Sequence, residues 1–196
     1  MYRKQLIFQR IVCMAMLFAA AIVFIYSLGL MTDLYDSLYF TMLNPDDYTE
    51  TFVEGSVIYY DMQPFNKSLT NASLGLILVT LVLFLTNTHT RRKYYIGNYI
   101  AVGLSTVCNV GVSAWALSQI FSFRAQYKQI DFEALKSFSE MMNTYYTEST
   151  FWFDVSLVVF GIVLIVTVLL IVNLILKLIM MKEEKRLIGS RKDVRA

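Results

Sequence analysis

Charged residues are scarce in this sequence, and long stretches contain none. Only 16% of the 196 residues are charged, against 57% that are hydrophobic, whereas an ordinary soluble domain has about 25% charged residues. No Asp, Glu, His, Lys or Arg falls near the middle of any long apolar stretch. Coupled transporters and intramembrane enzymes usually need such groups inside the bilayer. The sequence therefore argues against both classes and predicts a protein without enzymatic activity.

Cysteine and histidine are also rare, which removes most metal and nucleophile chemistry. Cys13 and Cys108 both fall within apolar stretches, so no disulfide can brace an exposed loop. The single histidine, His89, precedes three cations closely, which disfavours metal binding. Acids gather at residues 46–50 without the glycine and alternating spacing of a calcium loop. No phosphate-binding glycine loop or nucleophile motif is present, so we expect no catalytic site, metal or cofactor.

Apolar stretches, by contrast, dominate the chain. Four of them approach or exceed the roughly 20 residues that a helix needs to cross a bilayer. The predicted spans are about 11–31, 69–88, 94–123 and 151–181. The predicted connections are outer loops 32–68 and 124–150, with a cytoplasmic tail at 182–196. Residues 1–196 thus form a single all-α membrane domain, a four-transmembrane-helix bundle with a small extracytoplasmic cap of short helices.

The charges that are present divide unequally between the two sides. Segments 1–10, 87–93 and 177–196 together hold 13 Lys and Arg but three acids, and the remaining segments hold four Lys and Arg and 12 acids. Lys and Arg in short loops stay cytoplasmic. We therefore expect a plasma-membrane protein with both termini inside. The basic turn Arg91, Arg92 and Lys93 would fix topology and contact lipid headgroups.

Local patterns predict how the helices begin and end. Leu34, Leu38 and Met42 follow Asp33 at helical spacing, and 52–60 alternates loosely like a short strand or an irregular cap. Asp131 can cap a helix in the second outer loop. The third span should continue above the membrane to about Phe123. The last helix should end near Ile188, before Gly189.

Small residues mark one face of the third span. They recur every fourth position, at Gly97, Ala101, Ser105, Asn109 and Ser113. Small side chains let another helix approach closely, and Ser or Asn can hydrogen-bond across the contact. The pattern predicts a helix-packing seam, which faces either this chain's own helices, the favoured reading, or a partner. Asp154, at the start of the last span, is a candidate for lining an outer entrance, although an acid there more often reaches the headgroups.

Three segments carry a resemblance to a known group of proteins. Thr88–Ile100, Asp131–Lys136 and Ser149–Asp154 resemble small four-span bacterial membrane proteins that accompany carbohydrate ABC importers. The resemblance implies an auxiliary membrane subunit beside the importer's permease pair and not a permease itself.

The leading hypothesis is a non-enzymatic accessory or scaffold subunit of a larger transport complex. Its expected partners are membrane lipid and other integral membrane subunits, with ABC permease subunits among the candidates, and no nucleic acid. Above the membrane, the expected partner contacts are aromatic: Tyr35, Tyr39, Tyr59, Tyr60, Tyr145 and Tyr146. The alternative is a small self-associating channel or transporter in which the Ser105 and Asn109 face lines a polar path.

Overall fold

A computed structural model describes residues 2–30, 58–88, 96–142 and 148–193. Within these ranges the chain is helical and forms no strand. The elements are α1 (Tyr2–Gly29), α3 (Ile58–Thr88), α4 (Ile96–Tyr127), α5 (Phe132–Met142) and α6 (Phe151–Asp193). All except α5 are long and apolar enough to cross a membrane. The described part of the chain is therefore all-helical, with four helices of the length and composition of a multi-pass membrane protein.

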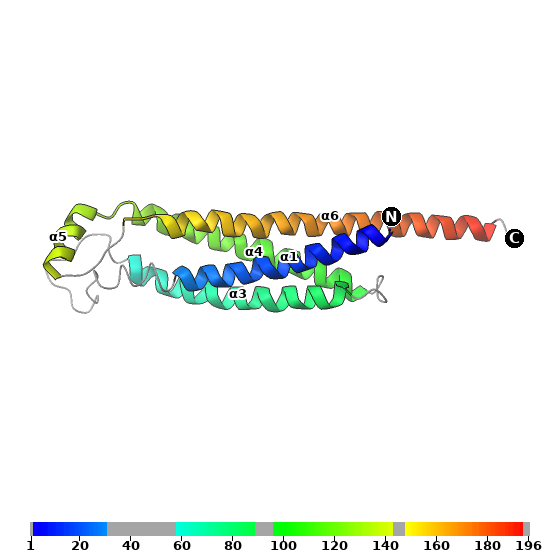
Figure 1. Cartoon of the computed structure of the whole chain (residues 1–196), viewed down its shortest axis with the longest axis horizontal. Helices are drawn as coiled ribbons and strands as arrows, with labels where there is room; N and C mark the ends of the chain where they lie inside the picture. The colour runs from blue at the N-terminus through cyan, green and yellow to red at the C-terminus, as the bar shows by residue number, and fades with distance from the viewer. Residues whose placement is uncertain (1, 31–57, 89–95, 143–147, 194–196) are drawn as a thin grey trace.

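The four long helices lie side by side in one elongated bundle (Figure 1). α1 packs against α3 and α6, and α4 packs against the same two helices. Helices that follow one another in the sequence are therefore neighbours in space. We call the end of the bundle that holds the start of α1 the terminal end, and the opposite end the α5 end. The last turns of α6 continue past the start of α1 at the terminal end (Figure 1).

Apolar side chains from all five helices fill the α5 end. Val23 of α1, Leu69 of α3, Ile120 of α4, Leu135 of α5 and Phe160 of α6 belong to one buried cluster. Each of these side chains is at most 1% exposed. The short helix α5 therefore adds one fully buried side chain, Leu135, to this cluster, and Phe132 packs against it.

A second apolar layer lies nearer the terminal end. Met16 of α1, Leu83 of α3, Val102 of α4 and Leu170 of α6 form its centre, with Cys13 beside them. This layer is distinct from the cluster at the α5 end. The bundle thus has two closed apolar layers along its length.

The outside of the bundle is as apolar as its inside. Ile25, Leu78, Val107 and Ile165, one from each long helix, are exposed, and Val107 reaches 71%. Several polar side chains are buried instead, among them Thr80, Asn109 and Asn173. Soluble proteins rarely expose large continuous apolar surfaces, whereas lipid-facing helices must. This distribution agrees with the membrane-spanning length of the helices.

The second long helix begins earlier than its apolar stretch predicted. α3 starts at Ile58, not near residue 69, and contains Pro64. Ile58, Met62, Phe65 and Leu69 recur at three- or four-residue spacing, and all are buried in the core. This stripe continues the helix beyond its continuous apolar run, because one buried face is enough to hold a helix. Residues 58–60 are accordingly helical and not part of a strand.

The other long helices also extend further than expected. α4 continues one turn beyond Phe123, to Tyr127. The prediction that Gly189 ends the last helix was wrong, because α6 runs through it to Asp193. A glycine inside a helix costs only about 1 kcal/mol relative to alanine, and basic and aliphatic residues surround this one. The expected helix after Asp33 lies outside the described residues.

Candidate functional site

The small-residue row of α4 faces the interior of this chain's own bundle. Ala101, Ser105, Asn109 and Ser113 are buried, the last three completely, and Gly97 is half-buried. Asn109 Nδ2 donates to the carbonyl oxygen of Ser105 at 2.6 Å and to its Oγ at 3.0 Å. Asn109 Oδ1 and Ser113 Oγ have no hydrogen-bond partner. With these side chains buried, this face of α4 offers a second protein little accessible surface.

A cluster of buried amide side chains occupies the terminal end. Gln5 Nε2 donates to Gln9 Oε1 at 3.0 Å and to Asn173 Oδ1 at 3.1 Å. Gln9 Nε2 donates to the backbone carbonyl oxygen of Asn87, and Asn87 Nδ2 donates to that of Asn98 at 3.4 Å. These contacts join all four long helices. We call this group, Gln5, Gln9, Asn87, Asn98 and Asn173, the amide cluster.

Lys177 is buried at the same end of the bundle. It follows Asn173 by one helical turn, and only 7% of its surface is exposed. Its Nζ lies 4.9 Å from the centre of the Tyr99 ring, and Tyr99 Oη contacts Met181 Sδ at 2.6 Å. In the described part of the chain no carboxylate forms an ion pair with Lys177. An aromatic face is thus the direct partner of this cation.

Asp154 is paired at the α5 end. It forms an ion pair with Arg124 of α4 and accepts a hydrogen bond from Thr150 Oγ1 at 2.7 Å. Each carboxylate oxygen therefore has a partner, although the side chain remains 47% exposed. This arrangement ties the start of α6 to the last turn of α4.

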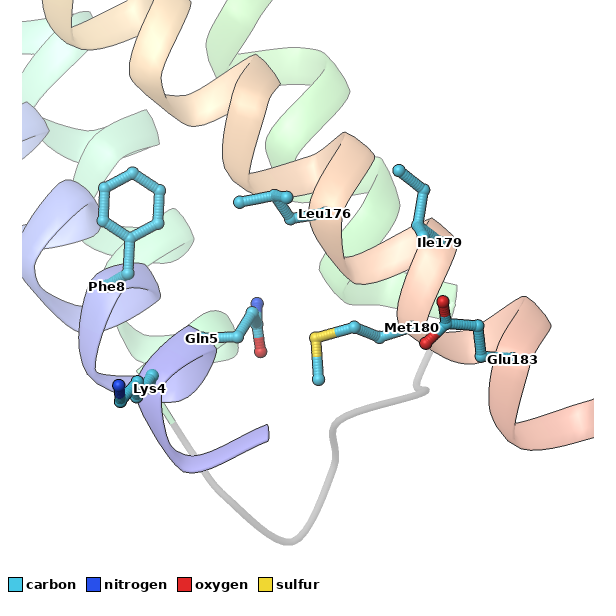
Figure 2. A pocket seen from close by; sticks show the side chains of 7 residues that line it. All are labelled: Lys4, Gln5, Phe8, Leu176, Ile179, Met180 and Glu183. Carbon is cyan, nitrogen blue, oxygen red and sulfur yellow. The ribbon is translucent and has the colours of Figure 1, made fainter. Parts of the chain in front are cut away.

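A groove opens between α1 and α6 at the terminal end (Figure 2). Its volume is about 400 Å³, within the range of roughly 300–1,000 Å³ typical of small-molecule sites. Lys4, Gln5 and Phe8 come from α1, and the other wall comes from α6. The α6 wall is formed by Leu176, Ile179, Met180 and Glu183. The groove is therefore an apolar surface that carries one cation and one anion.

Several residues proposed from the sequence cannot be placed. The basic turn at Arg91, Arg92 and Lys93 lies outside the described residues, as does the acidic cluster at 46–50. The same holds for four of the six tyrosines proposed above the membrane, and the side chains of Tyr59 and Tyr60 are not described either. Among the residues that are described, no group of three or more His, Cys, Asp or Glu could hold a metal ion.

The amide cluster and the groove were not predicted from the sequence. Charged side chains inside a span mark a candidate site directly, whereas uncharged amides do not. A signal was present, because Gln5 and Gln9 are one helical turn apart, as are Asn173 and Lys177. The amide side chains of the cluster can donate and accept hydrogen bonds and could bind a polar headgroup, but they include no acid–base pair. Compared with protein-family models, curated proteins and solved structures, the chain matches none significantly.

Proposed function

We propose that this chain is a non-enzymatic accessory subunit of a larger transport complex in the cell membrane. The observation that carries the proposal is the filled interior of the bundle. The apolar layer of Met16, Leu83, Val102 and Leu170 lies between Lys177 and the middle of the bundle. The larger apolar cluster fills the α5 end beyond it. A solute path through a single bundle would have to cross both layers.

The buried polar groups support the same conclusion. Ser105 and Asn109 bond to each other within α4, and Thr80 and Thr167 bond to carbonyl groups of their own helices. Proton or ion coupling in membranes usually depends on ionisable residues that face a cavity. Among the described residues, Lys177 is the one buried Asp, Glu, His, Lys or Arg. A bundle of this composition is better suited to contact with other subunits than to coupled transport.

The last part of α6 offers a surface for that contact. The helix has 43 residues, or about 64 Å at 1.5 Å per residue, roughly twice the hydrocarbon thickness of a bilayer. Arg186 is exposed near the end of α6, and the last turns of this helix continue past the start of α1 (Figure 1). We name residues 186–193 of α6 the α6 arm. An arm of this kind would reach a partner's soluble face while the bundle remains in lipid.

Orientation and partner class complete the proposal. The excess of Lys and Arg at both ends of the chain favours cytoplasmic termini, which would place the α6 arm in the cytoplasm. The choice of a carbohydrate ABC importer as the complex to test rests on the resemblance of residues 88–100, 131–136 and 149–154 to proteins that accompany such importers.

Co-purification with site-specific cross-linking tests the proposal. The full chain, carrying a photo-reactive residue at Arg186 in the α6 arm, would be irradiated in cells and purified in a mild detergent. We expect stoichiometric amounts of other integral membrane subunits, cross-linked to the arm. A photo-reactive residue at Met16, which is fully buried, is the matched control and should react only within the chain.

Two results would contradict an accessory role. A lone monodisperse monomer from every mild detergent would show that no stable complex exists. A homo-oligomer that carries ion flux when reconstituted in vesicles would favour the self-associating channel, and in that case Asn109→Leu should abolish the flux.

A further inference from the structure

We propose that the groove between α1 and α6 binds a phospholipid with a primary-ammonium headgroup, of the phosphatidylethanolamine class. The groove combines an apolar wall with one cation and one anion, Lys4 and Glu183. Figure 2 shows Lys4 on α1 and Glu183 on α6, with Phe8 and Leu176 further along the groove; in this view the Lys4 side chain is directed away from α6, and Gln5 points toward α6. This is the charge pattern of a zwitterionic headgroup followed by an acyl chain.

The depth of the groove fits a headgroup. Glu183 lies 31 residues after Trp152, an aromatic residue of the kind that marks a membrane interface. That separation corresponds to about 46 Å of helix, close to the roughly 40–45 Å of a bilayer that includes its headgroups. Phe8, Leu176 and Ile179 lie on the side toward the hydrocarbon, where they would contact the first methylene groups of an acyl chain.

The cationic side of the groove fits the phosphate. Lys4 is in the first turns of α1, which begins at Tyr2, so backbone N–H groups without helical partners lie close to it. Helix N-termini and lysine both favour phosphate groups. Lys4 is exposed and forms no ion pair with any described residue. Its charge is therefore available to a ligand.

Gln5 distinguishes an ammonium from a choline headgroup. Its Nε2 already donates to Gln9 and to Asn173, which fixes the amide plane, and the side chain is 8% exposed. In Figure 2 its oxygen points into the groove, and no described residue donates to that oxygen. Gln5 Oε1 and the Glu183 carboxylate are thus both acceptors. A primary ammonium has three N–H donors for them, whereas a trimethylated nitrogen has none.

The same two acceptors disfavour other occupants. Phosphatidylglycerol ends in a neutral glycerol, so it has no cation to pair with Glu183 and cannot form the charge-assisted hydrogen bond that an ammonium forms there. A second copy of this chain would need to present both a cation and an anion over an apolar ridge in one segment. The observed pattern of charge and acceptors therefore selects an ammonium-bearing lipid.

Competition between defined lipids tests the proposal. The delipidated full chain would be titrated with 1-palmitoyl-2-oleoyl phosphatidylethanolamine, phosphatidylcholine or phosphatidylglycerol, and bound lipid counted by native mass spectrometry. We expect phosphatidylethanolamine to bind at least about fivefold more tightly than phosphatidylcholine, as charge-assisted hydrogen bonds imply. Equal binding of these two lipids would overturn the proposal.

Variants at the two charges give separate signatures. Glu183→Gln should sharply reduce the preference for phosphatidylethanolamine over phosphatidylcholine, because only the neutral acceptors remain, and should leave phosphatidylcholine binding unchanged. Lys4→Gln should weaken the binding of phosphatidylethanolamine and phosphatidylcholine equally, because both lipids carry the phosphate. Glu183→Lys should reverse the preference toward phosphatidylglycerol, a gain that a misfolded protein could not produce.

Controls and contrary outcomes are equally specific. Glu133→Gln and Lys136→Gln alter the same residue types on the exposed side of α5, at the other end of the bundle, and should change nothing. A preference that Glu183→Gln leaves undiminished would contradict the assignment. So would a change of oligomeric state in the groove variants, which would make the groove a contact between copies of the chain.

Discussion

The indole ring of Trp152 lies against Gly29, the last residue of α1. A Cβ atom at residue 29 would come within 2.5 Å of the ring's Cη2 atom and 2.6 Å of Cζ3. Tyr26 Oη donates a hydrogen bond of 3.0 Å to the backbone carbonyl oxygen of Trp152, so the indole is held from the same helix that it contacts. Glycine at residue 29 is therefore what lets α1 and α6 meet at the α5 end.

Gly29→Ala should destabilise the bundle despite the better helix propensity of alanine. Overpacking typically costs about 1–3 kcal/mol, and alanine returns up to about 1 kcal/mol in a helix. We expect the free energy of unfolding in detergent to fall by about 1–2 kcal/mol. Gly111→Ala is the matched control, because nothing lies within 4 Å of the added atom. Its free energy of unfolding should not fall. Equal stability of the two variants would show that the indole moves aside at no cost.

Continuous apolar runs predicted the long helices but not their limits. A continuous run of apolar residues indicates a membrane span, because each side of such a helix faces either lipid or another helix. Beyond the bilayer only one buried stripe is needed, as Ile58, Met62 and Phe65 show at the start of α3. Helices in this protein therefore extend past the spans that composition defines. The role of Asp131 as the N-cap of α5 was predicted correctly, because its hydrogen bonds are local and reach only two and three residues along the chain.

The amide cluster could not be derived in the same way. Its contacts join α1 to α6 across 168 residues of sequence, through Gln5 and Asn173. Spacing along one helix shows that two polar groups share a face, but not which helix that face meets. The partner helix depends on the order of helices around the bundle, which is a property of the tertiary packing. The groove beside Gln5 depends on the same packing.

Lys177→Met should stabilise the isolated protein. The buried ammonium has no carboxylate partner in the described bundle, and burial of an unpaired charge costs several kcal/mol. The contact with the Tyr99 ring offsets about 0.5–2 kcal/mol of this cost. Methionine keeps a long flexible side chain, so we expect the free energy of unfolding to rise by about 1–3 kcal/mol.

Lys182→Met provides the comparison for that result. Lys182 is exposed on the next turns of α6, so its replacement should change the free energy of unfolding by less than about 0.5 kcal/mol. If Lys177→Met instead lowers stability while Lys182→Met does not, an anionic group must be paired with the Lys177 ammonium in the purified protein.

Asn109→Leu should be tolerated, although it removes two hydrogen bonds. Both bonds go to Ser105 within α4 and do not join two helices, and leucine also removes an acceptor for which the described residues supply no donor. We expect a change of less than about 1 kcal/mol in the free energy of unfolding. Asn109→Asp, which has the same shape, should cost about 2–3 kcal/mol more because it places a charge at mid-membrane. A severe loss in Asn109→Leu would mean that Asn109 Oδ1 binds an essential water or partner.

Asp131→Ala should loosen α5 without unfolding the bundle. Asp131 Oδ1 accepts hydrogen bonds from the backbone N–H groups of Glu133, at 3.1 Å, and Ala134, at 3.0 Å. An isolated helix of 11 residues is marginal in water, so α5 depends on this cap and on the buried side chain of Leu135. Loss of an N-cap costs about 0.5–2 kcal/mol.

Amide hydrogen exchange measures that loss locally. At about 1.4 kcal/mol per tenfold change, the cap corresponds to roughly 2- to 30-fold faster exchange in α5 of the Asp131→Ala protein. Asp131→Asn should retain most of the protection, because asparagine caps nearly as well. Lys136→Ala, on the exposed face of the same helix, should not accelerate exchange, because alanine favours helix. Faster exchange that spreads equally through α1 and α3 would contradict a local cap, since it would mean that α5 unfolds only together with the bundle core that contains Leu135.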